Sequence, residues 1–275
     1  MAPDELVDEL TTTLGSRREA AWVLEELEGL PADARRSRAL ELAARRSAGE
    51  PLQYLLGHWP FRALDLEVDG RALIPRPETE PLVELALAAL VHAGGRPLAC
   101  DLGCGTGAIA LSIAVESRAL GLDVEVHATD LSEASLQLAR RNAERVGVPG
   151  VRFHCGSWYE ALPASLHGAV SSLCSNPPYI SATERATLAR ELDFEPELAL
   201  VAPDGTDGTP GFAAVEAVVV GAVRWLAPGG TLLVEHGESH RDAAVACAIR
   251  AGLVEVVDHA DLAGRPRTLE ARRAP

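Results

Sequence analysis

From residue 97 to the end of the chain, short apolar runs alternate with longer amphipathic runs. Runs with strand character are 98–102, 124–129, 151–154, 169–174 and 231–235, and runs with helical periodicity are 108–119, 132–146, 213–225 and 241–251. This alternation predicts a parallel sheet with helices on both faces and right-handed crossovers. Two further runs, 254–258 and 268–271, predict an antiparallel hairpin at one edge. We therefore expect an α/β domain over residues 76–275.

The first 59 residues follow a different pattern and predict a separate, all-helical domain. Apolar residues recur at helical spacing through residues 4–56, beginning with Leu6, Leu10 and Leu14. Pro31-Ala32-Asp33 separates two of these helices, with Asp33 as the expected N-cap. A bundle of this size buries little apolar surface by itself, so we expect an accessory domain. The sequence is equally consistent with packing support and with a docking surface for a macromolecule.

Residues 60–75 are predicted to link the two domains. Phe61–Arg71 alternates apolar and charged side chains and then meets Asp69-Gly70, a combination typical of a β-hairpin. After the linker, Thr79 is the expected N-cap of a helix over 82–91.

A glycine-rich loop joins the first strand of the α/β domain to the helix that follows. Gly103, Gly105 and Gly107 permit a tight turn and the close approach of a ligand to backbone amides at a helix N-terminus. The spacing differs from the dinucleotide fingerprint, and no Gly-Lys-Ser/Thr follows to hold a triphosphate. Asp130 ends the next strand, roughly 20 residues further on, where a carboxylate commonly binds ribose hydroxyls. These features indicate S-adenosylmethionine, with a nicotinamide cofactor or a ligand-free turn as alternatives.

Trp158 follows the third strand-like run, in the stretch Gly156-Ser157-Trp158-Tyr159. An aromatic ring at this place could stack on the adenine of a bound nucleoside. The alternative is an ordinary tryptophan of the hydrophobic core.

The fourth strand-like run ends in Asn176-Pro177-Pro178-Tyr179, which we call the amide seat. The two prolines fix the backbone and remove two N–H donors, so that nearby carbonyls lack local partners. The Asn176 oxygen and a proline carbonyl can then accept both N–H groups of a planar amide or amine, with Tyr179 packed on its face. These contacts would leave the nitrogen lone pair directed at an electrophile.

The amide seat and the glycine loop are predicted to lie side by side. Both follow strands of one parallel sheet, and ligands of such sheets bind at the carboxyl edge of the strands. Methyl transfer to the held nitrogen would be an in-line displacement that depends mainly on orientation. The sequence offers no obvious general base for it.

Composition excludes several other classes of protein. A net charge of −15 argues against a surface that neutralises nucleic-acid phosphates. No stretch has the length of a membrane span, and the acidic N-terminus does not resemble a signal peptide. The five cysteines are scattered and fit no metal site, which predicts reduced thiols in a cytoplasmic protein; they are Cys100, Cys104, Cys155, Cys174 and Cys247.

Five stretches together resemble one family, in that family's order: 51–57, 74–80, 101–111, 176–180 and 195–200. They are similar to the peptide chain release factor glutamine methyltransferases, the PrmC or HemK family. The resemblance implies a Rossmann-like class I methyltransferase sheet with a helical N-terminal domain. It also implies methylation of the glutamine amide of the Gly-Gly-Gln motif of release factors, yielding S-adenosylhomocysteine. We further expect a monomer, and the acidic charge and the lack of a membrane span predict no contact with nucleic acid or membranes.

The resemblance also assigns roles to individual positions. It implies that the amide seat, Asn176, Pro177, Pro178 and Tyr179, holds the glutamine and carries the catalysis. It further implies a set of cofactor-binding residues and no metal ligand; the set is Gly103, Cys104, Gly105, Thr106, Gly107, Asp130, Trp158 and Asn176.

Two departures from the family pattern and three rival interpretations bear on this resemblance. Loop 201–208 is longer and less glycine-rich, and His240 stands where glutamine is common; neither is expected to contact the cofactor or the amide. Methyltransferases of ribosomal-protein glutamine share the seat, but stretches 51–57 and 76–80 favour release factors. Adenine amino-methyltransferases of nucleic acids use similar seats, and the acidic charge argues against them. The intact seat argues against a non-catalytic cofactor-binding protein.

Overall fold

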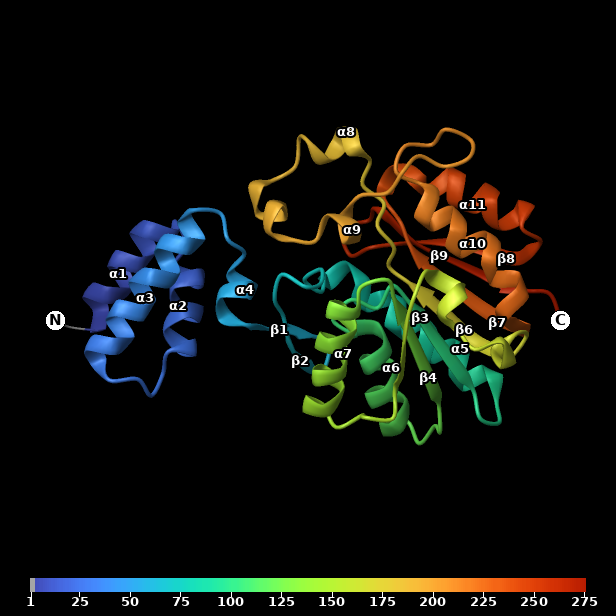
Figure 1. Cartoon of the computed structure of the whole chain (residues 1–275), viewed down its shortest axis with the longest axis horizontal. Coiled ribbons are helices and arrows are strands. Elements are labelled where there is room, and N and C mark those ends of the chain that lie inside the picture. Colours follow the sequence, from blue (N-terminus) through green and yellow to red (C-terminus); the bar gives the residue numbers. More distant parts are fainter. Residues whose placement is uncertain (1–2) are drawn as a thin grey trace.

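The computed structural model describes residues 3–275. Figure 1 shows an elongated molecule in which a small helical unit at the N-terminal end joins a larger body built around a sheet. The C-terminus lies at the far end of the larger body. No helix in the described part of the chain is long and apolar enough to cross a membrane.

The N-terminal unit is helical, as its periodicity predicts, and has an apolar core that includes Leu10, Val23 and Leu42. Its helices are α1 (Pro3–Leu14), α2 (Arg17–Glu26), α3 (Ala32–Ser47) and α4 (Leu52–Leu56). The predicted cap of α3 is wrong, because Pro31 occupies the N-cap position and Asp33 lies within the first turn. Pro31 has a φ of −54°, which already suits the entry into a helix, so α3 starts directly after it.

A two-stranded hairpin, β1 (His58–Phe61) and β2 (Leu64–Glu67), follows the helical unit. The alternating pattern predicts the hairpin, but the turn expected at Asp69-Gly70 is wrong. The chain reverses between β1 and β2, where Arg62 has a φ of 51°. Arg62 keeps this unusual conformation because its guanidinium donates to the Glu116 carboxylate and to the Glu80 carbonyl.

The larger body contains a sheet in the order β5-β4-β3-β6-β7-β9-β8, counted over the described residues. Its strands are β3 (Leu98–Leu102), β4 (Glu125–Asp130), β5 (Arg152–Cys155), β6 (Val170–Ser175), β7 (Leu226–Glu235), β8 (Leu253–Ala260) and β9 (Pro266–Arg273). Strands β3 to β7 pair in parallel, and β9 pairs antiparallel with β7 and β8. The predicted α/β class and the antiparallel edge are confirmed.

Helices cover both faces of this sheet, as Figure 1 shows. One core joins the sheet to α5 (Glu80–Ala93), α6 (Ala108–Ala119) and α7 (Glu133–Arg145), and the other joins it to α10 (Ala213–Trp225) and α11 (Arg241–Arg250). Neighbouring residues of β3 divide between the two cores, with Ala99 in the first and Cys100 in the second. This division follows from the alternation of side chains along a strand.

The strand order reverses next to β3. The chain proceeds outward from β3 through β4 to β5 and then restarts at β6, on the other side of β3. Open α/β sheets bind ligands outside the carboxyl ends of the strands at such a switch point. The glycine loop after β3 and the amide seat after β6 both lie there.

After the amide seat, the 181–200 segment leaves the sheet and returns to it. It contains α8 (Ala182–Arg185), the 3-10 helix η4 (Arg190–Phe194) and α9 (Glu197–Leu200). Ile180 and Val201 close its base by a parallel bridge. Figure 1 shows the segment reaching back toward the helical unit, and Arg46 of α3 pairs with Glu191 at 2.7 Å.

Candidate active site

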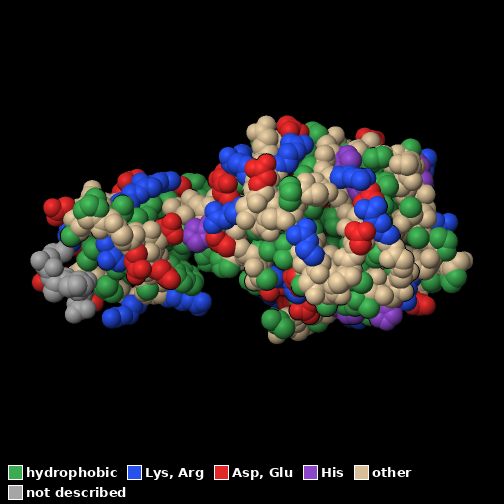
Figure 2. Space-filling model, turned by 90° about the horizontal axis from the view of Figure 1, so that it is seen from below, with side chains coloured by type: hydrophobic (Ala, Val, Ile, Leu, Met, Phe, Trp, Pro, Cys, Tyr) green, Lys and Arg blue, Asp and Glu red, His purple; other side chains and the backbone are tan. Residues whose placement is uncertain are grey.

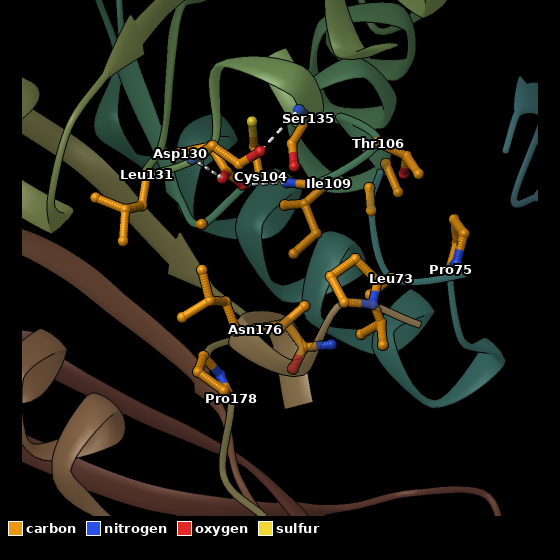
Figure 3. A pocket seen from close by; sticks show the side chains of 18 of the residues that line it. Leu73, Pro75, Cys104, Thr106, Ile109, Asp130, Leu131, Ser135, Asn176 and Pro178 are labelled. Carbon is orange, nitrogen blue, oxygen red and sulfur yellow. Dashed lines mark hydrogen bonds between the residues drawn. The ribbon is translucent and has the colours of Figure 1, made fainter. Parts of the chain in front are cut away.

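A cavity of about 280 Å³ opens at the carboxyl ends of β3, β4 and β6. Figure 3 shows Asn176 and Pro178 on one side of it and Cys104, Asp130 and Leu131 on the other. Its walls come from segments that are distant in the sequence: 71–79, 103–109, 129–135, 156–158, 176–178 and 196–199. The two predicted motifs therefore face the same space.

Several backbone amides of the glycine loop form hydrogen bonds within the protein, and one of these bonds positions Asp130. The Gly103 and Cys104 amides both donate to the Thr129 carbonyl at 2.8 Å. The Gly105 amide donates to Asp130 Oδ2 at 2.9 Å, and the Ser132 amide donates to Oδ1 at 2.8 Å. Burial raises the pKa of Asp130 even though these hydrogen bonds oppose the shift. The loop thus fixes a carboxylate at the edge of the cavity.

Gly103 allows Trp158 to form part of the cavity wall. A Cβ at Gly103 would lie 3.2 Å from the Trp158 ring, so a side chain there would crowd it. Trp158 has a φ of 42°, a conformation that non-glycine residues rarely adopt. Its ring lines the cavity and also packs against the core shared with α10 and α11. The surroundings of Trp158 thus fit both predicted alternatives, because the ring faces a possible ligand site and also packs in the hydrophobic core.

The rest of the loop divides between the cavity and the packing beneath it. Thr106 lines the cavity and is 2% exposed, and its carbonyl accepts a hydrogen bond from Asn142 Nδ2. Gly107 is not part of the wall: a Cβ there would lie 3.0 Å from Leu111 and 3.3 Å from Ala139. Gly107 therefore allows α6 to pack closely against α7.

Asn176 is held by Thr79, a residue that the sequence pattern predicted to be a helix cap. Its Nδ2 donates to Thr79 Oγ1 at 3.0 Å, and Thr79 Oγ1 donates to Glu235 Oε2 at 2.6 Å. Thr79 stands at the N-cap position of α5 but makes no side-chain capping bond, so the predicted capping role is wrong. Its hydroxyl instead donates to Glu235 and accepts from Asn176. Only the tertiary contact with β7 could have pointed to this role.

The members of the amide seat differ in their access to the cavity. Asn176 and Pro178 line it, whereas Pro177 is buried and Tyr179 packs behind it. The Tyr179 hydroxyl donates to Glu235 Oε1 at 3.3 Å and accepts from Arg267 Nη1 at 3.3 Å. Burial raises the pKa of Tyr179 above its ordinary value. The tyrosine is thus anchored at its hydroxyl.

One departure from the family pattern, His240, lies beside the amide seat, contrary to expectation. The His240 ring stands edge-on to Tyr179, with ring centroids 6.5 Å apart, and its Nε2 contacts the Pro210 carbonyl at 2.8 Å. The loop that includes 201–208 continues to Gly211, where a Cβ would lie 2.6 Å from the Tyr179 carbonyl oxygen. These residues pack against Tyr179 and thereby support the seat.

Local sequence patterns did not predict two further segments of the cavity wall. Residues 71–75, predicted only as part of a linker, form one side of the cavity together with Arg76, and residues 196–199 form another. Glu195 joins them: its carboxylate accepts the Ile74 amide at 3.0 Å and pairs with Arg76. The only signal for these segments in the sequence was the family resemblance.

The described residues contain no group of three or more His, Cys, Asp or Glu side chains placed to hold a metal ion. The cysteines are free thiols; Cys155 is exposed and the others are buried. On the face shown in Figure 2, basic and acidic side chains are interspersed around a hollow in the larger body. The helical unit forms a distinct lobe in this view.

Comparison with known proteins agrees with this geometry. A family model described as a methyltransferase domain matches residues 98–259. A release factor glutamine methyltransferase of Bordetella pertussis is 44% identical over 251 residues, covering 91% of this chain and 88% of that protein. Another, of Salmonella typhimurium, is 36% identical over 283 residues, covering 98% and 97%.

Among solved structures, a methyltransferase from Pyrococcus furiosus has a TM-score of 0.52 to this chain at 19% identity, covering 88% of this chain and 99% of the other. This likeness supports the fold. The alignments with the two relatives cover at least 88% of each protein. The chain belongs to the release factor glutamine methyltransferase family.

Proposed function

We propose that this protein transfers the methyl group of S-adenosylmethionine to the side-chain amide nitrogen of the glutamine in the Gly-Gly-Gln motif of peptide chain release factors. The observation that carries the proposal is that Asn176 and Pro178 face the same cavity as Asp130 and the glycine loop. The names of the relatives support the release factor as substrate.

The residues around the cavity fit this cofactor. The Asp130 carboxylate, fixed by two backbone amides, suits the ribose hydroxyls. The apolar surfaces of Ile109, Leu131 and Trp158 suit the adenine ring. When bound, S-adenosylmethionine supplies an electrophilic methyl group on a sulfonium. The remaining residues expected to bind the cofactor are Gly103, Cys104, Gly105, Thr106, Gly107 and Asn176, of which Gly107 acts through the packing of α6.

The protein's part in the reaction is to hold the amide in one orientation. Asn176 Oδ1 and a carbonyl of the Pro177-Pro178 pair accept the two N–H groups of the glutamine side chain, and Tyr179 keeps this backbone in place. The nitrogen lone pair then forms the new C–N bond as the C–S bond breaks. The hydrogen-bond acceptors stabilise the positive charge that develops on nitrogen. The surplus proton leaves to solvent, since a protonated amide nitrogen is a strong acid.

The proposal extends to the organisation of the whole protein. We assign residues 1–59 to a helical domain that docks the release factor, 60–75 to a linker and 76–275 to the methyltransferase domain. The separate apolar core of the helices supports this division. We further propose that the protein acts as a monomer in the cytoplasm, where release factors work.

Intact mass spectrometry tests the function directly. A purified release factor is incubated with the protein and S-adenosylmethionine, and a release factor whose Gly-Gly-Gln glutamine is replaced serves as the control. We expect the mass of one methyl group to be added to the natural factor and not to the control. No change in the factor, with transfer to a ribosomal protein or to nucleic acid instead, would contradict the proposed substrate.

A further inference from the structure

One buried carboxylate contacts both ends of the amide seat. Glu235, at the carboxyl end of β7, is 1% exposed. Its Oε2 accepts from Thr79, which in turn accepts from Asn176, and its Oε1 accepts from Tyr179. The first and last residues of the seat are therefore tied to the same group, although β7 lies far from the seat in the sequence.

The direction of these hydrogen bonds decides which end of the Asn176 amide faces the cavity. When Glu235 is ionised its carboxylate can only accept, so Thr79 gives the single proton of its hydroxyl to Glu235. The Thr79 oxygen can then only accept from Asn176, so it binds Nδ2 and not Oδ1. No residue in the described part of the chain donates to Oδ1, and the Asn176 side chain lines the cavity. The acceptor end is thereby left for a ligand.

Arg267 fixes the other half of the network. Its Nη1 donates to the Tyr179 oxygen at 3.3 Å and to the His236 carbonyl at 3.1 Å. Because the Tyr179 oxygen already receives a hydrogen bond, its own proton is directed to Glu235. Both carboxylate oxygens of Glu235 thus meet hydroxyl donors. Burial raises the pKa of Glu235, although these hydrogen bonds and the Arg267 charge oppose the shift.

We propose that Glu235, acting through Thr79, sets the polarity of the amide seat and makes it select an amide over a carboxylate. With Oδ1 of Asn176 facing the cavity, the seat accepts N–H groups and repels a carboxylate oxygen. A glutamine is therefore held, and a glutamate of the same shape is rejected. Glu235 is a positioning residue that reaches the substrate only through Thr79 and Asn176, and Thr79, which itself lines the cavity, acts by orienting the Asn176 amide. This inference rests on the proposed function.

The replacement Glu235→Gln tests the polarity with little change in volume. Because Arg267 directs the Tyr179 proton to position 235, the new amide oxygen faces Tyr179 and the new NH₂ faces Thr79. The Thr79 hydroxyl then accepts from residue 235 and donates to Asn176, which turns its own NH₂ toward the cavity. We expect the turnover number to fall roughly 100-fold while the dissociation constant of S-adenosylmethionine stays within about threefold.

The relative affinity for two release factors distinguishes a change in the polarity of the seat from a general loss of order in the site. The natural factor and one with glutamate in place of its Gly-Gly-Gln glutamine are titrated into the wild type and into E235Q. We expect the wild type to bind the natural factor more tightly by about tenfold or more and E235Q to lose or reverse this preference. A wild-type preference in E235Q would overturn the role of Glu235.

Two substitutions of Thr79 keep the test decisive even if E235Q does not fold. Thr79→Val keeps the shape and removes the hydroxyl, so we expect turnover to fall at least tenfold. Thr79→Ser keeps the hydroxyl and should retain turnover within about threefold of wild type. Wild-type turnover in T79V, or an equal loss in T79S, would overturn the relay. Failure of the proposed function is distinguishable, because the wild-type protein itself would then not methylate the release factor.

Discussion

At the scale of single residues, Asp101 carries a buried carboxyl group that the proposed chemistry does not use. It is 1% exposed; Oδ2 accepts the Ala110 amide at 3.1 Å, and Oδ1 has no partner in the described part of the chain. Burial raises the pKa of Asp101 to about 7. The folded protein thus binds a proton that the unfolded chain has already lost above pH about 4.

This pKa predicts how stability depends on pH. For an acid whose pKa is raised on folding, stability is full below the unfolded pKa and falls as the pH rises through the folded pKa, by at most about 1.4 kcal/mol per pH unit. Asp101→Asn removes the titration, so the stability of the variant relative to wild type should rise between pH 4 and about 7 and then level off. Urea unfolding at several pH values measures the difference, and a constant difference would contradict the assignment.

At the scale of elements, the loop before α10 supports the amide seat through Gly211. A Cβ at Gly211 would lie 2.6 Å from the Tyr179 carbonyl oxygen and 2.8 Å from the Ser181 amide nitrogen. Gly208, in the same loop, also has a positive φ, but a Cβ there would meet no other atom within 4 Å. The two glycines therefore separate the effect of crowding from that of backbone conformation.

We expect Gly211→Ala to displace the backbone at Tyr179 and to lower the turnover number by roughly 100-fold, because small displacements of a reacting group are costly. Gly208→Ala should lose about 1–2 kcal/mol of stability from its backbone conformation alone and keep its turnover. Steady-state kinetics and urea unfolding of both variants check this. Equal turnover in the two would show that the loop does not position the seat.

His58 joins the hairpin to the helical unit. His58 Nε2 lies 2.9 Å from Glu26 of α2, and Nδ1 lies 2.6 Å from Asp65 of β2. Burial acts to lower the pKa of His58, but hydrogen bonds to the two carboxylates and their charges outweigh it, so the pKa is raised. Both ring nitrogens face acceptors, which fits the doubly protonated ring.

Because the pKa of His58 is raised on folding, its contribution to stability is full below about pH 6.5 and is lost as the pH rises through the folded value. We expect His58→Gln to destabilise the protein at pH 6, by no more than about 1 kcal/mol because the site is partly exposed, and to have little effect at pH 9. His92→Gln is the control, since the hydrogen bond that the His92 ring forms in the described part of the chain goes to the Ala88 carbonyl of its own helix. Thermal unfolding of the wild type, H58Q and H92Q at both pH values measures these differences in stability. An effect of H58Q that does not depend on pH would contradict the proposed role of His58.

At the scale of the whole molecule, Arg46 connects the helical unit to the 181–200 segment beyond the amide seat. Its Nε donates to Glu19 of α2 at 2.9 Å, and its Nη1 donates to Glu191 of η4 at 2.7 Å. The hydrogen bonds to these carboxylates raise the pKa of Arg46. Residues 196–199 at the end of this segment line the cavity, so the contact extends the support of the site to α3.

We expect Arg46→Met to speed cleavage of the 181–200 segment by thermolysin about fivefold, which corresponds to about 1 kcal/mol lost from the contact. Arg38→Met is the matched control, because Arg38 lies on the same helix and pairs with Glu41 of that helix. Mass spectrometry of the fragments locates the cuts. Equal cleavage rates in R46M and R38M would show that Arg46 does not hold the segment.

The sequence by itself determined the order and type of the elements and the meeting of the two motifs. Periodicity, turn residues and glycine spacing are local properties, and strand topology then places the glycine loop and Asn176 at one edge. Local errors arose where distant partners prevailed. The hairpin turns at Arg62 because Glu116 and Glu80 hold that residue, and not at Asp69-Gly70.

Only the tertiary structure decided how the site is held in place. Thr79 and Glu235 are 156 residues apart, and Ile74 and Glu195 are 121 residues apart, yet each pair shares a hydrogen bond at the cavity. No local pattern encodes such a pair, because the partners meet only after folding has brought β7 beside the start of α5 and the 181–200 segment beside the 71–76 stretch. Local residue patterns thus predicted that Asp130, Asn176 and Pro178 share one cavity, and packing at long range decides the direction in which the Asn176 amide points.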